Sequence, residues 1–328
     1  MRILLTDPIL SRFAAELSHD GTDGHDWELL AGRPDAEIED RLREADVLVA
    51  SRMTPAMAKA AERLRLVHVT GAGYDRIPLD DLAPGVTVCN TFHHGRSIAE
   101  HVVMASVLLS RRVLRADRLL RQGVWESVAV DPSVRLGGTL AGRTVGVVGL
   151  GEIGRQVVRT TTALGMRARA TRRNPDAPLP PGLDLDRVDG DDALGDLLEA
   201  SDVVVLTVPL SAATRGLIDA DALRRMRSDA ILINVARGPI VDEDALYDAL
   251  SEGRLGGAAL DVWWSHPKDG GGARGYTRPF HELENVLLTP HHSGHTLETF
   301  TGRAGEIAAN IAKLAEGEAL TNVVRSPV

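Results

Sequence analysis

A glycine-rich turn in the middle of the chain limits the possible folds more than any other feature. The apolar run 145–148 leads directly into the sequence GLGEIG at residues 149–154. A helix-like segment and a second short run follow, and that run ends at two arginines. A strand, a tight glycine turn and a helix in this order are typical of a βαβ unit that binds a dinucleotide. A tight turn in another kind of α/β protein is the alternative interpretation.

Each glycine of this motif has a predicted task. Gly149 permits the tight turn out of the strand, Gly151 lets the backbone approach a pyrophosphate, and Gly154 lets the helix pack closely on the strand. The helix is expected to begin near Glu152 and Ile153, where its free N–H groups and the positive end of its dipole face the phosphates. These five residues are therefore candidates for cofactor binding.

Length and composition favour a two-domain globular enzyme. At 328 residues the chain is longer than one typical domain. Apolar residues make up 44% of it and charged residues 25%, which is ordinary for such a protein. The formal net charge of -9 comes from acidic and basic residues mixed along the chain. This balance argues against a nucleic-acid partner and against a basic membrane-binding patch.

Cysteine usage and apolar run lengths indicate the compartment. The single cysteine, Cys89, has no intrachain partner for a disulfide and lies in the apolar run 86–89, which favours a buried, inert thiol in a reducing cytoplasm. The first apolar run is too short for a signal peptide and is interrupted by Asp7. No apolar run is long enough to span a bilayer. We therefore expect a cytoplasmic protein.

Apolar runs and turn signals predict an α/β organisation with parallel sheets. Strands are expected at residues 2–6, 46–50, 66–70 and 86–89 before the glycine motif, and at 202–209, 230–234, 258–261 and 287–289 after it. Helices are expected at residues 98–121 and 297–316, and between an N-cap at Asp242 and a stop at Gly253. The Gly- and Pro-rich residues 266–279 are expected to form a surface loop.

The loops that follow these strands are the places to look for chemistry, because ligands of open parallel sheets bind beyond the carboxyl ends of the strands. Four loops qualify, at residues 71–75, 149–154, 234–238 and 289–294. The third contains an arginine and the fourth contains histidines, which suggests anion binding and proton transfer respectively.

Five ordered sequence blocks together resemble the D-isomer-specific 2-hydroxyacid dehydrogenases. They are GLGEIG, LTVPLSAATRGLI at 206–218, NVARGPIVDEDAL at 234–246, ALDVW at 259–263 and TPHHSGHT at 289–296. The earlier segments GAGYD, SIAEH and QGVWES also match the family. The resemblance implies hydride transfer between a nicotinamide cofactor and a 2-keto acid or D-2-hydroxy acid, as in a glyoxylate or hydroxypyruvate reductase.

The resemblance also implies an architecture of two doubly wound parallel-sheet α/β domains. A Rossmann cofactor domain of residues 99–292 is inserted into a flavodoxin-like substrate domain formed by residues 1–98 and 293–328. The active site is expected in the cleft between them, where hinge closure excludes water. The helix at 98–121 and the QGVWES segment resemble the part through which relatives dimerise, which implies a homodimer.

Roles for individual residues follow from the same resemblance. Arg237 matches the arginine that binds the substrate carboxylate, for which a guanidinium offers two parallel hydrogen bonds. His291 matches the histidine that gives a proton to the keto oxygen or removes it in reverse, and His292 and His295 are expected to be bystanders. The backbone N–H groups of Ala72 and Gly73 match the loop that holds the other carboxylate oxygen. Further cofactor-binding candidates are Pro209, Thr214, Val235 and Asp261.

One position departs from the family pattern. The family usually has a glutamate before a proline in this region, where it orients the catalytic histidine, whereas this chain has His266 in the run DVWWSHP. Relatives such as formate dehydrogenases also resemble this chain in having a non-acidic residue there. Our hypothesis is that His266 orients His291, which then loses its proton at lower pH than in glutamate-bearing relatives. The alternative is that His266 has moved away with the insertion that follows it.

Cofactor choice is predicted at the end of the second strand of the βαβ unit. NAD-dependent relatives have an aspartate there for the ribose hydroxyls, whereas this chain has Arg172 and Arg173. Guanidiniums would bind a 2′-phosphate that a carboxylate would repel, so NADP(H) is predicted over NAD(H). The alternative is two solvated arginines at the end of a strand.

The substrate itself is the least defined part of the prediction. Arg52, His93, His94 and Arg96 lie in segments that line the substrate side in this family, and of these Arg52 and His94 are the substrate-binding candidates. Their polarity suggests a second polar or anionic group on the substrate, although each one alone fits a surface position. No metal-binding spacing such as HExxH is present, so no metal is expected.

Two other functions are consistent with parts of the sequence. One is a dinucleotide-sensing binding protein that resembles the family's corepressors, which the missing glutamate favours and Arg237 and His291 oppose. The other is a phosphite-oxidising relative, which is disfavoured because such proteins have a lysine where this chain has Ala72.

Overall fold

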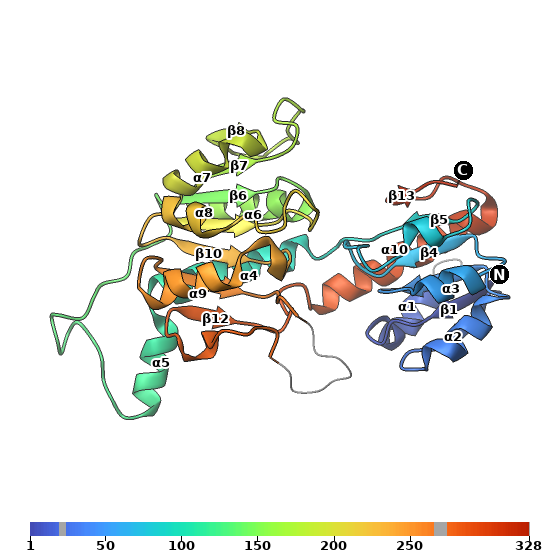
Figure 1. Ribbon diagram of the computed structural model, residues 1–328, viewed down its shortest axis with the longest axis horizontal. Coiled ribbons are helices and arrows are strands. Elements are labelled where there is room, and N and C mark those ends of the chain that lie inside the picture. The colour runs from blue at the N-terminus through green and yellow to red at the C-terminus, as the bar shows by residue number, and fades with distance from the viewer. Residues whose placement is uncertain (20–23, 266–273, 328) are drawn as a thin grey trace. The chain divides into compact units, whose positions relative to one another are not determined.

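The computed structural model describes residues 1–19, 24–265 and 274–327, and the chain divides into two compact units (Figure 1). The first unit comprises Met1–His93 and His295–Val328, and the second comprises His94–Gly294. The sequence places these boundaries after residues 98 and 292. The observed boundary after His93 is earlier because helix α4, Gly95–Ser110, packs against helix α6, Glu152–Ala163, inside the second unit.

The first unit is built on a six-stranded sheet with the order β13-β5-β4-β3-β1-β2. Its strands are β1 (Arg2–Leu5), β2 (Asp26–Leu29), β3 (Val47–Ala50), β4 (Leu66–Val69), β5 (Thr87–Cys89) and β13 (Val323–Arg325). Its helices are α1 (Ala14–His19), α2 (Asp35–Leu42), α3 (Pro55–Ala60) and α10 (Leu297–Glu316), with short 3-10 turns at Leu10–Phe13 and Leu79–Asp81. Only the β13–β5 pair is antiparallel among the pairs of this described sheet.

The order of the first five strands confirms the flavodoxin-like prediction. Every residue of β3 and β4 is buried, as expected for central parallel strands covered by helices on both faces. The sequence prediction missed β2 and β13. Both lie at the edges of the sheet and have exposed or half-buried residues throughout, so neither gives a continuous apolar run.

The second unit has a seven-stranded, all-parallel sheet with the order β12-β11-β10-β9-β6-β7-β8. Its strands are β6 (Thr144–Val148), β7 (Arg167–Thr171), β8 (Arg187–Asp189), β9 (Val203–Leu206), β10 (Ile231–Asn234), β11 (Gly257–Leu260) and β12 (Val286–Leu288). Besides α4 and α6, its helices are α5 (Val113–Arg121), α7 (Leu194–Ala200), α8 (Ala220–Arg225) and α9 (Glu243–Ser251). Short 3-10 turns occur at Asp191–Ala193, Gly238–Ile240 and Phe280–Glu282.

This strand order reverses direction at β6, which is the doubly wound Rossmann arrangement that the glycine motif predicts. The two faces of the sheet bury separate hydrophobic cores. Val203 and Val205 belong to one core, whereas Val204 and Leu206 belong to the other. Such two-sided burial explains why these strands read as continuous apolar runs in the sequence.

The predicted single helix at residues 98–121 is wrong in one respect, because the structure divides it into α4 and α5. Arg112, between the two helices, has a φ angle of 51° and lies in the left-handed region. A helix cannot continue through such a residue, so the chain changes direction there.

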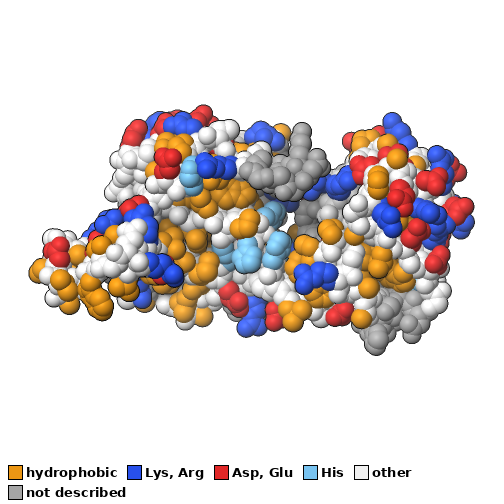
Figure 2. Space-filling model, turned by 90° about the horizontal axis from the view of Figure 1, so that it is seen from below, with side chains coloured by type: hydrophobic (Ala, Val, Ile, Leu, Met, Phe, Trp, Pro, Cys, Tyr) orange, Lys and Arg blue, Asp and Glu red, His pale blue; other side chains and the backbone are white. Residues whose placement is uncertain are grey.

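Helix α5 begins a segment that projects from the second unit (Figure 1). We call residues 111–138 the arm. Figure 2 shows hydrophobic side chains gathered on it, and they include Leu120, Val124, Trp125, Val130 and Leu136, each about half exposed or more. Within residues 1–19, 24–265 and 274–327, no helix is both long and apolar enough to cross a membrane.

Candidate active site

The sheet of the second unit brings the predicted site residues to one edge. Because its strands are all parallel, the loops that follow β6, β9, β10, β11 and β12 share that edge. Those loops contain the glycine motif, Pro209, Arg237, Asp261 and His291. The geometry at this edge determines what the second unit can bind.

The glycine loop has the backbone that a dinucleotide requires. Gly149 has a φ angle of +97°, and a Cβ added there would lie 2.7 Å from Cγ1 of Val208. A Cβ on Gly154 would lie 2.2 Å from the carbonyl oxygen of Gly149, so only glycine permits this contact between the helix and the turn. A Cβ on Gly151, by contrast, would meet nothing within 4 Å. The space beside Gly151 is therefore open.

The start of α6 supplies hydrogen-bond donors to that space. Gly151 is the N-cap and provides no side-chain cap. In the described part of the chain, the N–H groups of Glu152, Ile153 and Gly154 have no hydrogen-bond acceptor. Unpaired N–H groups at the positive end of a helix fit a pyrophosphate. Arg155, which the sequence analysis did not single out, lies in the same turn and pairs with Glu152 at 3.5 Å.

The two arginines after β7 have different environments. Arg172 donates hydrogen bonds to the carbonyl oxygens of Pro175, at 2.8 Å, and Ala177. Its guanidinium therefore holds its own loop. Arg173 is exposed and has no hydrogen bond or ion pair to any described residue. The pair that the sequence suggests is thus one structural arginine and one arginine available to a ligand.

The Arg237 loop is fixed by residues on either side of it. The buried side chain of Asn234, the last residue of β10, donates to the carbonyl oxygen of Arg237 at 3.0 Å and accepts from the N–H of Ala236 at 3.1 Å. A Cβ on Gly238 would lie 2.2 Å from the backbone carbon of Trp263, so this loop packs directly on the chain after β11. Arg237 itself is half-buried. The support that Asn234 gives to this loop is not predicted from the sequence.

His291 lies in an unusual backbone conformation. Its φ angle is 56°, in the left-handed region that non-glycine residues rarely adopt. Its N–H donates to the carbonyl oxygen of Asp261 at 2.8 Å, and its side chain is exposed. Such strain persists only where the surroundings hold it, and it is often found at functional sites.

The carboxylate of Asp261 holds the His291 loop. One oxygen accepts from the Thr289 hydroxyl at 2.6 Å and from the His292 N–H at 2.7 Å. The other accepts from the Ser293 N–H at 3.0 Å and from the Ser293 hydroxyl. Asp261 is almost fully buried, and all four bonds lead to the segment around His291. Asp261 is predicted from the sequence to bind the cofactor, whereas these hydrogen bonds make it a support of the histidine loop.

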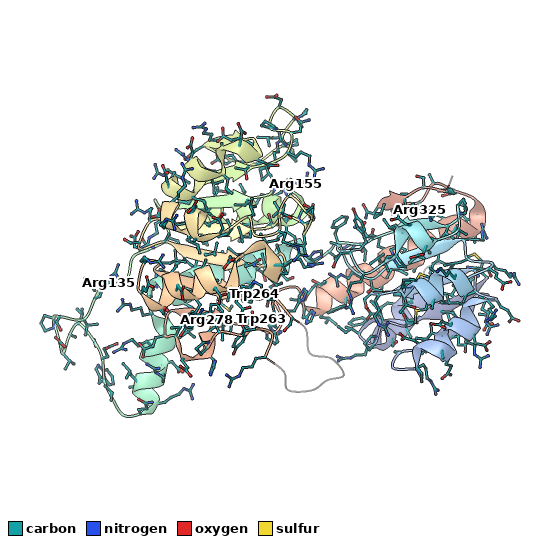
Figure 3. The ribbon with its side chains drawn as sticks, viewed as in Figure 1. Arg135, Arg155, Trp263, Trp264, Arg278 and Arg325 are labelled. Carbon is teal, nitrogen blue, oxygen red and sulfur yellow. The ribbon has the colours of Figure 1, made fainter. Side chains whose placement is uncertain are left out.

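Two tryptophans after β11 tie the loops together (Figure 3). The indole N–H of Trp263 donates to the carbonyl oxygen of Thr289 at 3.0 Å, and that of Trp264 donates to the carbonyl oxygen of Val241 at 2.7 Å. The segment after β11 is thereby joined both to the His291 loop and to the chain that follows Arg237. Both tryptophans lie in the run DVWWSHP, but nothing in their spacing predicts that they join these loops.

Histidines surround the same loop inside the second unit. His94 is buried before α4, and a Cβ on Gly294 would lie 3.3 Å from its Cβ. His101, on α4, is also buried, and burial lowers its pKa although the charge of Asp261 opposes this. His94 was predicted in the substrate domain and lies in the second unit instead. His94 belongs to the second unit because it packs against Gly294. Gly294 comes directly after Ser293, which is hydrogen-bonded to Asp261.

The remaining cofactor candidates have structural contacts. The Thr214 hydroxyl donates to the Pro209 carbonyl at 2.7 Å and accepts from the Ser211 N–H at 2.8 Å, which shapes the turn after β9. Val235 is buried directly after β10. His266, the predicted orienter of His291, lies outside the described residues, and so does the first part of the predicted 266–279 loop.

In the first unit, the loop after β4 has the predicted open backbone. The side chain of Asn90 donates to the carbonyl oxygen of Ala72 at 2.8 Å, and the N–H of Thr91 donates to that of Gly71 at 3.3 Å. The N–H groups of Ala72 and Gly73 have no acceptor among the residues that the structure describes. The loop is thus held through its carbonyl groups, while these two N–H groups remain available to an anion.

Arg52 follows β3 in the same unit and is bound to Asp35. Its guanidinium contacts both carboxylate oxygens, at 2.5 and 3.1 Å, and this ion pair lowers the pKa of Asp35. An arginine so engaged is less available to a substrate than the sequence suggests. In the described ranges of the chain, no group of three or more His, Cys, Asp or Glu side chains is arranged to hold a metal ion.

Comparison with known proteins gives consistent results. Residues 103–293 match the family described as D-isomer specific 2-hydroxyacid dehydrogenase, NAD binding domain. The glyoxylate reductase of Korarchaeum cryptofilum is 36% identical over 303 residues, covering 89% of this chain and 86% of that protein. The D-3-phosphoglycerate dehydrogenase of Methanocaldococcus jannaschii is 31% identical over 333 residues, covering 100% of this chain and 60% of that protein.

A solved structure is similar over the full length of the chain. An acyclic imino acid reductase in complex with NADPH and D-Arg has a TM-score of 0.80 and 26% sequence identity, covering 99% of this chain and 100% of that one. The similarity in fold thus extends through both units.

Proposed function

The chain belongs to the D-isomer-specific 2-hydroxyacid dehydrogenases, and from this we propose that it reduces a small 2-keto acid to the D-2-hydroxy acid with NADPH. The observation that carries the proposal is the arrangement at one edge of the second sheet. Arg237 follows β10 and His291 follows β12, while Asp261 and Trp263, which follow the intervening strand β11, fix the His291 loop. The glycine loop that fits a dinucleotide lies at the same edge.

Each residue has a chemical task in this reaction. The nicotinamide cofactor, when bound, supplies the hydride. Arg237 would bind the substrate carboxylate through two hydrogen bonds and so orient the neighbouring keto group. His291 would donate a proton to the keto oxygen as negative charge develops there. The N–H groups of Ala72 and Gly73 would bind the carboxylate as well, and α6 would bind the cofactor phosphates through its first N–H groups.

Glyoxylate is the first substrate to test, because several similar proteins, including that of Korarchaeum cryptofilum, are named glyoxylate reductases. The experiment follows NADPH absorbance with glyoxylate, hydroxypyruvate and other 2-keto acids, using the wild type and the Arg237→Ala and His291→Ala variants. We expect each variant to lower kcat/KM by about 100-fold or more, because each removes a group that acts in the transition state.

Matched controls are available on the surface of the same unit. Arg254 and His281 are exposed, and they precede β11 and β12, whereas the candidate residues follow these strands, so Arg254→Ala and His281→Ala should retain wild-type activity. Tight NADPH binding without turnover of any 2-keto acid would contradict the proposal and would favour the dinucleotide-sensing alternative.

The preference for NADPH rests on Arg173. Its exposed guanidinium follows β7, the strand after which dehydrogenases of this fold contact the adenosine ribose. The similar imino acid reductase structure contains NADPH, which is consistent with this preference. The ratio of kcat/KM for NADPH and NADH tests it.

A homodimer formed through the arm is part of the proposal. Trp125 is 69% exposed and Leu136 is 76% exposed, and both belong to a projecting segment. A contiguous set of large exposed apolar side chains of this kind is typical of protein–protein interfaces.

We also propose that the protein works in a reducing, cytoplasmic compartment. Burial raises the pKa of the Cys89 thiol to about 11, so this thiol is inert. A chain whose sole cysteine is buried gains nothing from an oxidising environment.

A further inference from the structure

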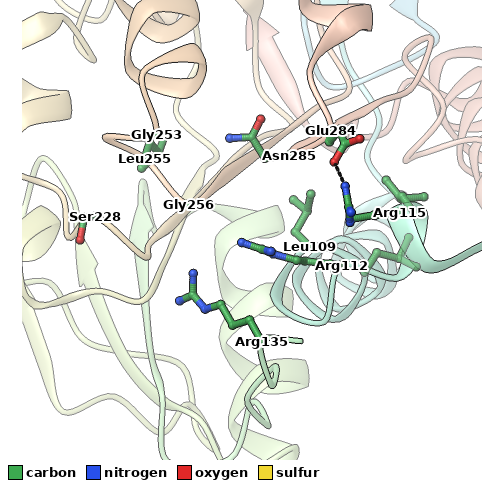
Figure 4. A pocket seen from close by; sticks show the side chains of 12 residues that line it. Leu109, Arg112, Arg115, Arg135, Ser228, Gly253, Leu255, Gly256, Glu284 and Asn285 are labelled. Carbon is green, nitrogen blue, oxygen red and sulfur yellow. Dashed lines mark hydrogen bonds and ion pairs between the residues drawn. The ribbon is translucent and has the colours of Figure 1, made fainter. Parts of the chain in front are cut away.

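A cavity of about 260 Å³ lies at the opposite edge of the second sheet from the candidate active site (Figure 4). Ser228 lies shortly before β10, Gly256 directly precedes β11, and Asn285 directly precedes β12, and all three line the cavity. It therefore lies at the amino ends of the strands whose carboxyl ends carry Arg237, Asp261 and His291. The proposed reaction does not use this cavity.

The arm closes the cavity on one side. A Cβ on Gly137 would lie 2.7 Å from the carbonyl oxygen of Ser110 and 2.8 Å from Cα of Arg111, so the returning end of the arm packs directly on the end of α4. This contact brings Arg135 to the cavity that Arg112 also lines. Figure 4 shows both side chains extending into the same space.

Arg112 occupies a position that usually suits glycine or asparagine. Its φ angle of 51° is unfavourable for a side chain with a Cβ. The conformation directs a guanidinium to the cavity wall at the junction of α4 and α5. A residue that adopts a costly backbone conformation at the wall of a cavity is a candidate for binding.

The positive charge in the cavity exceeds the negative charge. Glu284 lines the cavity, but its two oxygens bind Arg115, at 2.6 Å, and Arg118. Arg115 also binds Glu126 at 2.8 Å, so these two acids and two arginines balance one another. Within the described residues, no hydrogen bond or ion pair is made by the guanidiniums of Arg112 and Arg135. The pKa of Glu126 is lowered mainly by its hydrogen bonds with Arg115 and also by the charge of Arg112. These four arginines still exceed the two acids by two positive charges.

We infer that this cavity is a binding site for a small anion of the phosphate class, held by Arg112 and Arg135. Two guanidiniums offer paired N–H donors that match the tetrahedral oxygens of a phosphate group, and Ser228 also lines the cavity. The leucines of the cavity, Leu108, Leu109, Leu114 and Leu255, give it an apolar lining that would accommodate the body of a phosphorylated small molecule.

Inorganic phosphate is the probe, and its binding is measured by calorimetry at constant ionic strength on protein saturated with NADPH, so that the dinucleotide site is filled. We expect the Arg112→Gln, Arg135→Gln double variant to weaken phosphate binding at least tenfold. The Arg112→Lys, Arg135→Lys double variant keeps the charge and should retain most of the affinity. The Arg12→Gln, Lys59→Gln double variant, with two exposed changes in the other unit, removes the same net charge and should bind as the wild type does.

Two further variants locate the anion. If Arg173→Gln or Arg237→Gln abolishes phosphate binding while the double glutamine variant keeps it, the phosphate lies at the cofactor or substrate residues and the inference is wrong. Absence of phosphate binding by the wild type also overturns it. A change of oligomeric state in the double variant, seen by light scattering without phosphate binding by the wild type, would instead assign the two arginines to self-association.

Discussion

At the scale of single residues, the candidate site depends on a few buried polar groups that hold strained or exposed ones. His291 keeps a left-handed backbone because Asp261 binds the segment on both sides of it through its carbonyl oxygen and both carboxylate oxygens. Asn234 does the same for the Arg237 loop. The side chains assigned to chemistry are thus positioned by neighbours that need not touch the substrate.

Replacing Asp261 with asparagine tests this support. The amide would keep one accepting oxygen, but its NH2 group would face N–H and O–H donors that have no other acceptor there. An unsatisfied buried donor costs about 1–3 kcal/mol, so the loop should shift and kcat/KM should fall about 5- to 150-fold. Steady-state kinetics and their pH profile measure the effect, because misplacement of His291 should change the profile.

Asp219→Asn is the matched control for that change. Asp219 caps α8 on the surface of the same unit, and asparagine caps helices as well as aspartate does. This variant should keep its activity. Wild-type kinetics in Asp261→Asn would show that the four hydrogen bonds do not position His291.

The two arginines after β7 allow a sharp test of cofactor choice. Arg173→Gln should lower kcat/KM for NADPH by about 10- to 100-fold and leave the value for NADH nearly unchanged, because only NADPH has the 2′-phosphate. Arg172→Gln removes bonds to Pro175 and Ala177, so it should affect both cofactors alike. Equal losses for both cofactors in Arg173→Gln would rule out the assigned role.

The sequence shows which charged residues follow a strand, but it does not show which partner each of them binds. Adjacent arginines after a strand suggest a phosphate site, but whether a guanidinium turns back to carbonyls of its own loop depends on a turn that forms only in the folded chain. The same limit applies to Asp261. Its place in a family motif suggests a cofactor contact, whereas its hydrogen bonds depend on β11 and β12 being neighbours.

At the scale of helices and strands, the sequence predicts best where burial is two-sided. The central strands of both sheets read as apolar runs because helices cover both of their faces. The prediction also gives the cap of α9 correctly, since the Asp242 side chain accepts from the Ala245 N–H at 2.9 Å and Gly253 has a φ angle of +69°. It fails for the edge strands β2, β8 and β13, which have no buried residues and therefore give no apolar run.

The break between α4 and α5 is a failure of another kind. The apolar spacing continues through Arg112, and neither glycine nor proline marks the end of α4. The left-handed turn at Arg112 coincides with the packing of Gly137 on Ser110, a contact between residues 27 positions apart that no local pattern reports. The direction of the arm is therefore set by tertiary contacts.

The arm gives a prediction at this scale. Trp125→Glu places a charge among the exposed apolar side chains, and burying an unpaired charge in an interface costs several kcal/mol. We expect the variant to shift the protein from dimer to monomer in size-exclusion chromatography with light scattering. Leu164→Glu introduces the same residue at an exposed apolar position outside the arm and should leave the dimer intact. A monomeric wild type would contradict the proposed dimer.

At the scale of the whole molecule, the first unit is assembled from both ends of the chain. Helix α10 returns after the inserted unit, and its buried Asn310 joins it to the sheet. The Asn310 amide donates to the ring of His68 on β4 at 2.9 Å, and its oxygen accepts from the N–H and hydroxyl of Thr321, both at 2.9 Å. A polar cluster in the core thus connects the N-terminal and C-terminal segments.

This cluster makes the stability of the first unit depend on pH. Burial lowers the pKa of His68 from 6.5 to about 4, although the Val69 carbonyl and Glu306 oppose this. In a protonated His68, the ring N–H would face the NH2 group of Asn310, so two donors would oppose each other. If the Asn310 amide rotated to offer its oxygen to His68, it would lose the hydrogen bonds from Thr321. Between pH 6.5 and pH 4 the unfolded state therefore binds more protons than the folded state, so lowering the pH in this window favours unfolding.

The expected loss at pH 5 is about 2 kcal/mol of unfolding free energy relative to pH 7. In His68→Gln the position no longer titrates, so this part of the pH dependence should disappear, although the variant is less stable at neutral pH because of altered packing. Hydrogen exchange of the β4 amides, corrected for the intrinsic effect of pH, measures the local free energy in both proteins. His281→Gln, at an exposed position in the other unit, should retain the wild-type slope. Equal slopes in the wild type and His68→Gln would mean that His68 does not couple protonation to the folding of this unit.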